Sequence, residues 1–445
     1  MKKAAFLTLG CRVNQYETEC VREGILSQGF TEGSVEEECD LYFLNTCAVT
    51  GESVRKGKQL LRRVLRKKEQ NPEAVVCLCG CFPQGERENL DLFRNVDVLA
   101  GNTRKSELAN LLVTYCNTPL SQRIPMDLRE DISRPRAYEP MQLCRSHNAR
   151  AFVKIQDGCN SFCTYCYVPL VRGRVRSRQA EDIFSEVERL RDNGYGEVVL
   201  TGIETGAWGT DFSTPADLCD LVETLAERTG VERIRFGSLK PSLFTDSFCR
   251  RLSAIPSVLP HFHLSLQSGS SHILSLMGRK YDRAVEEEAI GNIYRYFPDA
   301  GLSADLICGF PGERDEDFAD TVSLVQKANL LHTHIFPFSP REGTKAAAMK
   351  EVSAEVKKKR CAELLEVAKA SGASFAEKRV GRRYRVFCER VRDGAMLGYT
   401  ENFIYTKTPV KGEVTVGQCY DVILSEERTF SVETMIVSGK LFRNS

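Results

Sequence analysis

The sequence lacks two features that would place it in a specialised class: a long apolar run and an excess of charge of one sign. No apolar run approaches the ~18 residues that a membrane-spanning helix requires. The 445 residues hold 61 Lys and Arg against 60 Asp and Glu, which argues against a uniformly basic nucleic-acid-binding protein. Solenoid repeats and low-complexity tracts are also absent. At roughly 100–200 residues per domain, the length predicts two to four folded domains.

Tryptophan and histidine are scarce, with 1 and 6 residues, whereas cysteine is abundant, with 18. A secreted disulfide scaffold does not explain the many cysteines, because such scaffolds are short chains that lack a core of their own. The first residues, MKKAAFLTLGC, imitate a lipoprotein signal, but the stretch from Ala4 to Leu9 is shorter than the ~7–15 apolar residues of a signal core. We therefore predict a cytoplasmic protein without membrane association, whose reduced thiols are available for metal binding or catalysis.

The N-terminal part of the chain alternates short apolar segments with longer helical ones. The strand candidates are 4–11, 40–47 and 74–81, and the helix candidates are 15–29 and 52–70. Strand–helix–strand repetition predicts an α/β fold with a doubly wound parallel sheet. We assign this sheet to a first domain over residues 1–140.

Each of these three strand candidates ends in a cysteine: Cys11, Cys47 and Cys81. Ligands of an open parallel sheet bind outside the carboxyl ends of its strands, so the three thiols are predicted to converge. The spacing alone leaves two interpretations open, a three-thiolate metal site or ordinary buried cysteines. For Cys77 and Cys79 we prefer the ordinary role, because they fall within the strand, on the face of Cys81 but before the binding edge.

A second alternating series follows a proline-containing connection over 115–150. Its strand candidates are 151–156, 197–202, 233–238, 261–266, 302–310 and 333–338, separated by helical stretches such as 179–193, 215–229, 282–296 and 314–328. Six strand–helix units without a seventh and eighth predict an open, partial (β/α)6 barrel. We assign it to residues 141–375, and a charged helix over about 353–379 leads out of it.

The C-terminal part of the chain has a different character. From Val380 to Val437 the apolar runs are short, rich in β formers and punctuated by glycine. This pattern predicts a small antiparallel β-barrel of OB-like size, which we assign to residues 376–445.

The most specific motif is GCNSFCTYCYVP, in which Cys159, Cys163 and Cys166 have the spacing C-x3-C-x2-C. Three thiolates in one short loop can bind three irons of a 4Fe-4S cubane and leave the fourth iron open. Zinc would need a fourth ligand nearby, and His147 precedes the motif at an unsuitable distance. A cysteine-rich structural loop without metal is the remaining alternative.

This loop resembles the radical S-adenosylmethionine (SAM) superfamily, and the resemblance covers about residues 150–345. It implies that the open iron chelates SAM, whose reductive cleavage gives a 5′-deoxyadenosyl radical. Three later segments match that family in order: LTGIETG (200–206), HLSLQSGS (263–270) with Arg279, and ADLICGFPGE (304–313). The implied SAM contacts are Tyr165, Gly202, Glu204, Gln267, Arg279 and Asp305.

Two charged residues depart from the family pattern. Glu204 occupies a position where relatives tend to have a neutral polar residue, and Lys240 follows the third strand, where an acidic residue is common. Their opposite charges at adjacent strand ends predict a compensating pair. His261 and His263 alternate along an apolar strand, for which we prefer a satisfied core role.

Two cysteine triads followed by a small β domain resemble the radical SAM methylthiotransferases over essentially the whole chain. The resemblance implies a second 4Fe-4S cluster, on Cys11, Cys47 and Cys81, that carries the sulfur unit, and a TRAM-like RNA-binding module at the C-terminus. It also implies that one SAM methylates this sulfur and a second yields the radical. TLGCRVNQYETE and LNTCAVTGES are most similar to the branch acting on N6-threonylcarbamoyladenosine at position 37 of tRNA.

Basic residues are unevenly distributed along the neutral chain. Arg172, Arg174, Arg176 and Arg178 alternate just after the radical SAM cysteines, and we predict an exposed arginine ladder that contacts RNA phosphates. The stretch from Glu52 to Gln70 holds eight Lys and Arg. It is either an RNA-binding surface or a solvated helix face.

Together these observations predict a tRNA methylthiotransferase that adds a methylthio group to C2 of N6-threonylcarbamoyladenosine. An aromatic C–H bond offers neither a proton for a base nor a leaving group, so a carbon radical suits the reaction. The implied partners are the tRNA anticodon loop, a low-potential electron donor and a sulfur donor, and we expect a monomer. The alternatives are the same chemistry on isopentenyladenosine or on a ribosomal-protein side chain, or a non-catalytic iron–sulfur protein that binds RNA or carries electrons.

Overall fold

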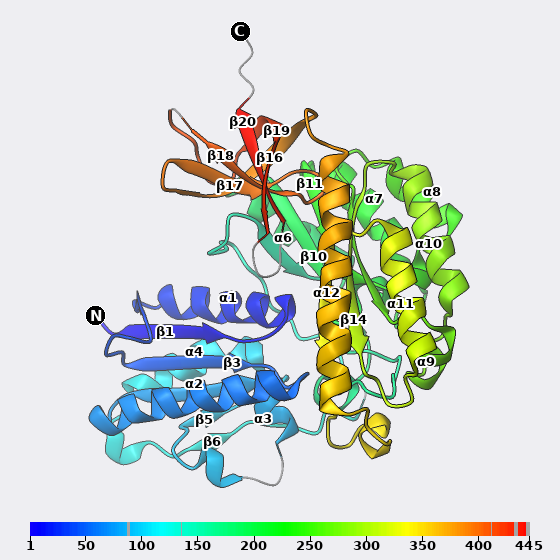
Figure 1. Cartoon of the computed structure of the whole chain (residues 1–445). Helices are drawn as coiled ribbons and strands as arrows, with labels where there is room; N and C mark the ends of the chain where they lie inside the picture. The colour runs from blue at the N-terminus through cyan, green and yellow to red at the C-terminus, as the bar shows by residue number, and fades with distance from the viewer. Residues whose placement is uncertain (87–89, 135, 411, 431–434, 442–445) are drawn as a thin grey trace.

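The computed structural model describes residues 1–86, 90–134, 136–410, 412–430 and 435–441 (Figure 1). Residues 87–89, 135, 411, 431–434 and 442–445, which fall within the three predicted domains, lie outside the described part of the chain. The fold is α/β, with a parallel N-terminal sheet, a central set of parallel strands flanked by helices, and a small C-terminal barrel. It has the fold class predicted from the sequence.

The N-terminal sheet has six parallel strands in the order β2-β1-β3-β4-β5-β6. Their bounds are β1 (Lys3–Thr8), β2 (Thr31–Gly33), β3 (Leu41–Thr46), β4 (Val75–Gly80), β5 (Val98–Leu99) and β6 (Met126–Asp127). The sequence predicts β1, β3 and β4. It does not reveal the other three, because strands of two or three residues carry too little periodicity.

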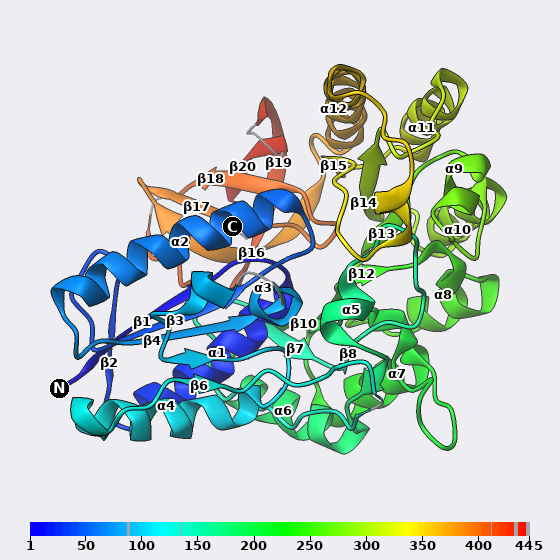
Figure 2. The same ribbon diagram turned by 90° about the horizontal axis from the view of Figure 1, so that it is seen from below.

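Helices cover both faces of this sheet, which confirms the doubly wound arrangement. Figure 2 shows the sheet between α2 (Gly51–Gln70) on one side and α1 (Arg12–Leu26) with α4 (Leu108–Asn117) on the other. Successive side chains of β3 enter different apolar layers: Phe43 packs with Leu108 of α4, and Leu44 packs with Leu61 of α2. A strand buried on both faces reads as a continuous apolar run, as 41–46 does.

The central domain contains the six predicted strand positions of a partial barrel. The strands form two neighbouring parallel sheets, β11-β10-β7 and β12-β13-β14-β15. Their bounds are β7 (Ala151–Lys154), β10 (Glu197–Thr201), β11 (Arg233–Phe236), β12 (Ser238–Leu239), β13 (His261–Gln267), β14 (Gly301–Cys308) and β15 (His332–Pro337). The third predicted strand is thus divided at Gly237 into β11 and β12.

Helices pack on the outer side of these strands, as Figure 1 shows. They are α6 (Ala180–Asp192), α7 (Leu218–Thr229), α8 (Asp246–Ser253), α9 (Ser271–Leu276), α10 (Arg283–Tyr296), α11 (Asp315–Ala328) and the long α12 (Ala354–Glu377). Along β13, Phe262, Leu264 and Leu266 are fully buried in this core, whereas His263, Ser265 and Gln267 are half-buried. The half-buried set faces the interior of the partial barrel.

The C-terminal strands form a closed five-stranded barrel in the order β16-β17-β18-β20-β19. Their bounds are β16 (Arg383–Arg392), β17 (Ala395–Tyr399), β18 (Tyr405–Pro409), β19 (Cys419–Phe430) and β20 (Met435–Leu441). The prediction of a purely antiparallel barrel is wrong in one respect, because β18 and β20 pair in parallel to close it.

This barrel docks on the central domain through buried polar groups. Arg235 of β11 donates to the carbonyls of Thr400 and Glu401, each at 2.9 Å, and Asn402 donates to Asp299. His261 stacks on Phe403 with ring centroids 4.0 Å apart. In the described part of the chain, no helix combines the length and apolar character of a membrane span.

Candidate iron–sulfur and SAM sites

Cys11, Cys47 and Cys81 lie at the carboxyl ends of three adjacent strands, as the strand pattern predicts. Cys11 follows β1 and is the N-cap residue of α1, Cys47 follows β3, and Cys81 begins the short helix α3 (Cys81–Gly85) after β4. Gly10, with φ of +112°, brings the first loop against the second, since a Cβ there would lie 3.2 Å from Cys47 Sγ. The three thiols therefore share one edge of the sheet.

Polar groups are directed at these sulfurs. The backbone N–H of Val49 donates to Cys47 Sγ at 3.4 Å, and the side-chain amide of Asn102 donates to Cys81 Sγ at 3.3 Å. Such donors stabilise thiolates that bind a metal. Burial raises the pKa of Cys47 to about 12, so at neutral pH its proton leaves only when a metal ion replaces it.

Cys77 and Cys79 do not share a face with Cys81, so that part of the prediction is wrong. Both are fully buried in the apolar layer beneath α1 and α4, whereas Cys81 packs in the layer of α2. The reason is Gly80, whose φ of +100° ends the strand and turns the chain into α3. Strand alternation therefore does not extend to Cys81, and the two strand cysteines point away from the sheet edge.

Cys159, Cys163 and Cys166 lie on a loop between β8 (Gln156–Asp157) and α5 (Val168–Arg172). Backbone hydrogen bonds fix this loop, including Thr164 N–H to the carbonyl of Met277 at 2.9 Å. Burial raises the pKa of Cys159 to about 11 and that of Cys166 to about 12. Like Cys47, these thiols become anionic ligands when a metal ion displaces the proton.

The spacing of both triads fits an iron–sulfur cluster better than a single ion. Among the described residues, the one group of three His, Cys, Asp or Glu ligand atoms within 4.8 Å of one another consists of His263, Asp305 and His334. A single zinc ion, with Zn–S bonds of about 2.3 Å, would hold three sulfurs closer than that. A cubane spreads its cysteine ligands more widely, so a 4Fe-4S cluster is compatible with these thiol donors, whereas neither triad meets the spacing of a single ion.

Glu204 and Lys240 form an ion pair, which confirms the predicted compensation. The other carboxylate oxygen of Glu204 accepts from Ser161 Oγ at 2.9 Å and lies 2.9 Å from Cys159 Sγ. Burial would raise the pKa of Glu204, but Lys240 holds it below its ordinary value. The pair is therefore directed at the cysteine loop from two neighbouring strand ends.

Three other predicted SAM contacts are Arg279, Gln267 and Tyr165, of which Tyr165 belongs to the cysteine loop itself. Arg279 Nη1 lies 3.6 Å from Cys163 Sγ. Gln267 ends β13 with φ of +73°, a conformation that is uncommon outside glycine and often marks functional sites. Tyr165 packs edge-on against Phe310, with ring centroids 6.2 Å apart.

The remaining two predicted contacts differ in their surroundings. Gly202 follows β10, and a Cβ there would lie 2.7 Å from Gln156 Oε1, so glycine permits the close approach. Asp305 lies inside β14, and its Oδ1 is 3.1 Å from His263 Nε2. The predicted core role therefore fits His261, which is buried against the C-terminal barrel, but not His263, which faces the barrel interior.

The predicted exposed arginine ladder is wrong for three of its four members. Arg172, Arg176 and Arg178 are 0%, 6% and 1% exposed, and only Arg174 is open to solvent. The hypothesis assumed that crowded arginines need an external anion, but their partners are carboxylates of this chain. The three buried arginines are therefore not accessible to RNA phosphates.

Arg172 is the centre of a buried network that links the two cysteine loops. Its guanidinium contacts Glu17 at 2.8 Å, Asp157 at 3.1 Å and Asn14 Oδ1 at 2.5 Å. Arg172 ends α5, the helix that follows the Cys159–Cys166 loop, and Asn14 lies in the first turn of α1, three residues after Cys11. The two sites are thus held together by protein charges.

Sequence reasoning missed Glu17 and Asn14, although a signal was present. Both occur in CRVNQYETE, where spacing of three and six residues after Cys11 places them on the inner side of α1. Burial would raise the pKa of Glu17, but Arg172 and two lysines hold it well below its usual range. Glu17 is therefore an anion in the folded protein. The lysines are Lys105 and Lys154.

Arg174 remains accessible beside the radical SAM cysteines. Its guanidinium lies 4.4 Å from the ring centroid of Phe162, which is 46% exposed and sits between Cys159 and Cys163. Phe162 has φ of +47°. An exposed aromatic ring with a stacked arginine is a platform on which a nucleobase can stack.

Comparisons with known proteins agree with this geometry. A profile of the radical SAM superfamily matches residues 153–325, and a profile of the uncharacterized protein family UPF0004 matches residues 3–101. Among solved structures, the fold is similar to the radical SAM methyltransferase TsrM from Kitasatospora setae, with a TM-score of 0.53 at 13% identity, covering 89% of this chain and 80% of that one. The central domain therefore defines a radical SAM enzyme.

Curated relatives extend over nearly the whole chain. It is 33% identical to the threonylcarbamoyladenosine tRNA methylthiotransferase MtaB of Bacillus subtilis (strain 168), over 93% of this chain and 91% of the relative. It is 35% identical to MtaB of Aquifex aeolicus, over 95% of this chain and 100% of the relative. The tRNA-2-methylthio-N(6)-dimethylallyladenosine synthase of Pelotomaculum thermopropionicum is 34% identical, over 94% and 91%. The chain belongs to the radical SAM methylthiotransferase family, whose radical SAM domain implies a 4Fe-4S cluster and SAM.

Proposed function

We propose that this enzyme adds a methylthio group to C2 of N6-threonylcarbamoyladenosine at position 37 of tRNA, with one 4Fe-4S cluster on each cysteine triad. The observation that carries the proposal is the juxtaposition of two three-thiol sites, on loops joined by Arg172. One site suffices for a radical, so a second one next to it calls for a second task. Carrying the sulfur that is transferred is such a task.

SAM is held, in this proposal, by the groups around the radical SAM loop. When bound, the cluster on Cys159, Cys163 and Cys166 supplies the electron that cleaves SAM to a 5′-deoxyadenosyl radical. Gly202, directly after β10, is the proposed neighbour of the SAM amino group. The paired charges of Glu204 and Lys240 orient its polar end. The remaining proposed contacts are Tyr165, Gln267 and Arg279. Asp305, which the family resemblance also implies, lies inside β14 beside His263, so we leave it out of the proposed SAM site.

The proposed N-terminal cluster holds the sulfur unit near this radical. Arg172 positions both loops, and the donors from Val49 and Asn102 stabilise the thiolates of Cys47 and Cys81. A sulfur donor and a low-potential electron donor complete the set of partners. We further propose a cytoplasmic monomer.

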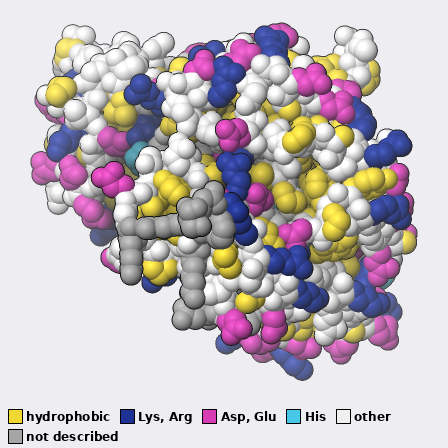
Figure 3. Space-filling model, turned by 90° about the horizontal axis from the view of Figure 1, so that it is seen from above, with side chains coloured by type: hydrophobic (Ala, Val, Ile, Leu, Met, Phe, Trp, Pro, Cys, Tyr) yellow, Lys and Arg dark blue, Asp and Glu magenta, His cyan; other side chains and the backbone are white. Residues whose placement is uncertain are grey.

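RNA binding is assigned to the C-terminal barrel, as a TRAM-like module, and to the Arg174–Phe162 platform. Figure 3 shows that the face carrying this barrel has Lys and Arg interspersed with Asp and Glu. The target adenine leaves the anticodon-loop stack at a cost of a few kcal/mol, which remote phosphate contacts offset. The RNA-binding role of the barrel is tested by Lys407→Ala, because Lys407 is exposed on β18. Deletion of the whole barrel is a poorer test, since it would expose Arg235, which is buried against Thr400.

The second candidate substrate is N6-dimethylallyladenosine, because relatives named for it are as similar as those named for the threonylcarbamoyl nucleoside. The sequence motif around Cys11 favours N6-threonylcarbamoyladenosine. The test is mass spectrometry of tRNA nucleosides from a strain without the gene and from the complemented strain. Loss and return of 2-methylthio-N6-threonylcarbamoyladenosine supports the proposal. An unchanged tRNA profile contradicts it and points to a protein substrate, and absence of 5′-deoxyadenosine formation in vitro points to a non-catalytic protein.

A further inference from the structure

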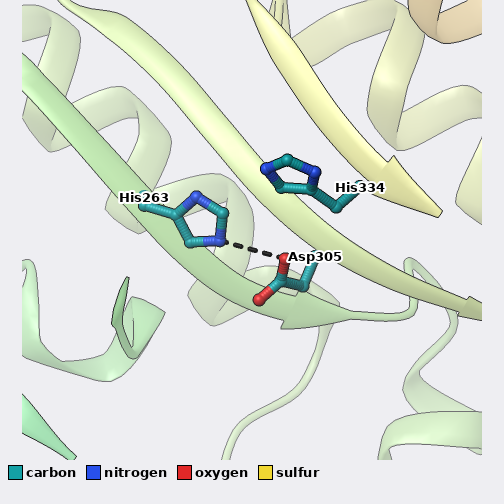
Figure 4. A group of neighbouring side chains, drawn as sticks. All are labelled: His263, Asp305 and His334. Atoms are coloured by element: carbon teal, nitrogen blue, oxygen red, sulfur yellow. Dashed lines mark ion pairs between the residues drawn. The ribbon is translucent and has the colours of Figure 1, made fainter. Parts of the chain in front are cut away.

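His263, Asp305 and His334 form a polar cluster on the inner wall of the partial barrel (Figure 4). They come from the three consecutive strands β13, β14 and β15. Asp305 and His334 are register partners across β14 and β15. His263 Nε2 lies 3.1 Å from Asp305 Oδ1, and the two imidazole centroids are 5.5 Å apart.

This cluster is open to the barrel interior. The side chains of His263 and Asp305 are 19% and 29% exposed, while their strand neighbours Leu264 and Ala304 are fully buried against the helices. His334 is also half-buried. Polar groups that line an interior wall without being enclosed are available to a ligand that enters it.

We propose that His263, Asp305 and His334 bind the polar N6 substituent of the target adenosine and thereby select threonylcarbamoyladenosine over dimethylallyladenosine. This inference rests on the proposed function. A threonylcarbamoyl group carries a carboxylate and a carbamoyl carbonyl that accept hydrogen bonds, and N–H and O–H groups that donate them. The imidazoles and the Asp305 carboxylate offer both complementary kinds of group.

The position of the cluster suits this role. C2 of the adenine must face the radical SAM loop, at the carboxyl ends of the strands. The N6 substituent leaves the ring in another direction, and so extends toward a different part of the barrel wall. His263 and Asp305 lie before the ends of their strands, Gln267 and Cys308. The cluster is therefore set back from the loop that holds the reacting atoms.

The hydrogen-bonding groups of this cluster also disfavour dimethylallyladenosine as the substrate. A dimethylallyl group has no hydrogen-bonding atoms, so it would remove water from the cluster without replacing the lost bonds. Sites built to hydrogen-bond a substrate group reject analogues that lack it far more strongly than apolar pockets discriminate by size. An ion pair of the cluster joins His263 to Asp305, so substitution of His334 changes the cluster while both residues of that pair remain.

The experiment compares two synthetic anticodon stem-loops that differ only in the N6 substituent at the target adenosine. Each is incubated with reconstituted full-length enzyme, SAM and dithionite, and methylthio product is quantified by mass spectrometry. Binding of each stem-loop is measured in parallel by fluorescence anisotropy. The variants are His334→Phe, which keeps an aromatic ring without polar atoms, and His334→Gln, which keeps hydrogen bonding. His272→Phe is the matched control, because His272 pairs with Asp317 outside the barrel.

We expect wild type to prefer the threonylcarbamoyl stem-loop, His334→Phe to lower that preference about ten- to hundredfold, and His334→Gln to retain most of it. His272→Phe should leave the ratio unchanged. Equal losses on both stem-loops, or an unchanged ratio in His334→Phe, overturn the inference alone. Wild type that modifies neither stem-loop overturns the proposed function as well. Stoichiometric zinc or manganese that is lost in His334→Phe would show a metal site instead.

Discussion

Arg172 and Glu17 form a buried ion pair, 2.8 Å between Nη1 and Oε1, that joins the loop of one cysteine triad to the loop of the other. Both side chains are 1% exposed. The two residues lie 155 positions apart in the sequence, Glu17 in α1 and Arg172 in α5, so the pair fixes how the N-terminal sheet meets the partial barrel. Removing Arg172 takes away one of the three cations that pair with the buried Glu17, the others being Lys105 and Lys154.

Arg172→Met should therefore destabilise the protein by up to about 3–5 kcal/mol, because Glu17 and Asp157 lose one of their two shared cations, Lys154 being the other. Urea unfolding followed by circular dichroism measures this change. Arg174→Met is the matched control, since Arg174 is exposed and makes no ion pair with a described residue. Equal stability of the two variants would contradict the structural role of Arg172.

Arg174→Ala should lower the salt dependence of tRNA binding by about one unit in the slope of log K against log salt. The reason is that an exposed arginine beside the cysteine loop can contact a phosphate, whereas Arg176 cannot. Filter binding at several salt concentrations gives the slope. A slope that falls in Arg176→Ala, with its fold intact, but not in Arg174→Ala would reverse this assignment.

Anaerobic reconstitution should yield about eight irons per chain, from two four-iron clusters. Replacing Cys159, Cys163 and Cys166 by Ala should halve the iron and retain the first cluster, as Mössbauer spectroscopy can resolve. Cys79→Ala is the control, because Cys79 points into the apolar layer beneath α1. Iron loss in Cys79→Ala as severe as in Cys81→Ala would refute the proposed ligand set.

Acidification should weaken the junction between the central domain and the C-terminal barrel. Arg235, Arg150 and Arg233 lower the pKa of the buried Glu197 from 4.5 to about 2, against the effect of burial. A folded-state pKa below the unfolded value adds stability that is fully present above pH 4.5 and lost as the pH falls toward 2. This contribution is about 3 kcal/mol.

The comparison of Glu197→Gln with wild type tests this pH dependence. The free energy of unfolding of the variant, measured by urea denaturation between pH 6 and pH 3, should be lower at pH 6 and change less on acidification. Parallel pH profiles for the two proteins would assign the acid sensitivity to other carboxylates.

The strand positions were predictable, because each strand is a short apolar run in the sequence. The convergence of the cysteines was predictable as well, because each follows a strand and the carboxyl ends of parallel strands meet at one edge of the sheet. The opposite charges of Glu204 and Lys240 at adjacent strand ends likewise predicted their pairing. Burial of Arg172 was not predictable from VRGRVRSR, since the same alternation fits an exposed strand and its partner Glu17 lies far away in sequence. The turn at Gly80 similarly hid the true orientation of Cys79.

The central claim, that the two cysteine triads do different tasks, is tested most directly by Cys11→Ala. The variant is incubated with SAM, dithionite and a threonylcarbamoyladenosine stem-loop, and 5′-deoxyadenosine and methylthio nucleoside are quantified from the same reaction. We predict continued 5′-deoxyadenosine formation with no methylthio product. Full methylthiolation, or loss of 5′-deoxyadenosine while the cluster on Cys159, Cys163 and Cys166 is spectroscopically intact, would contradict the account.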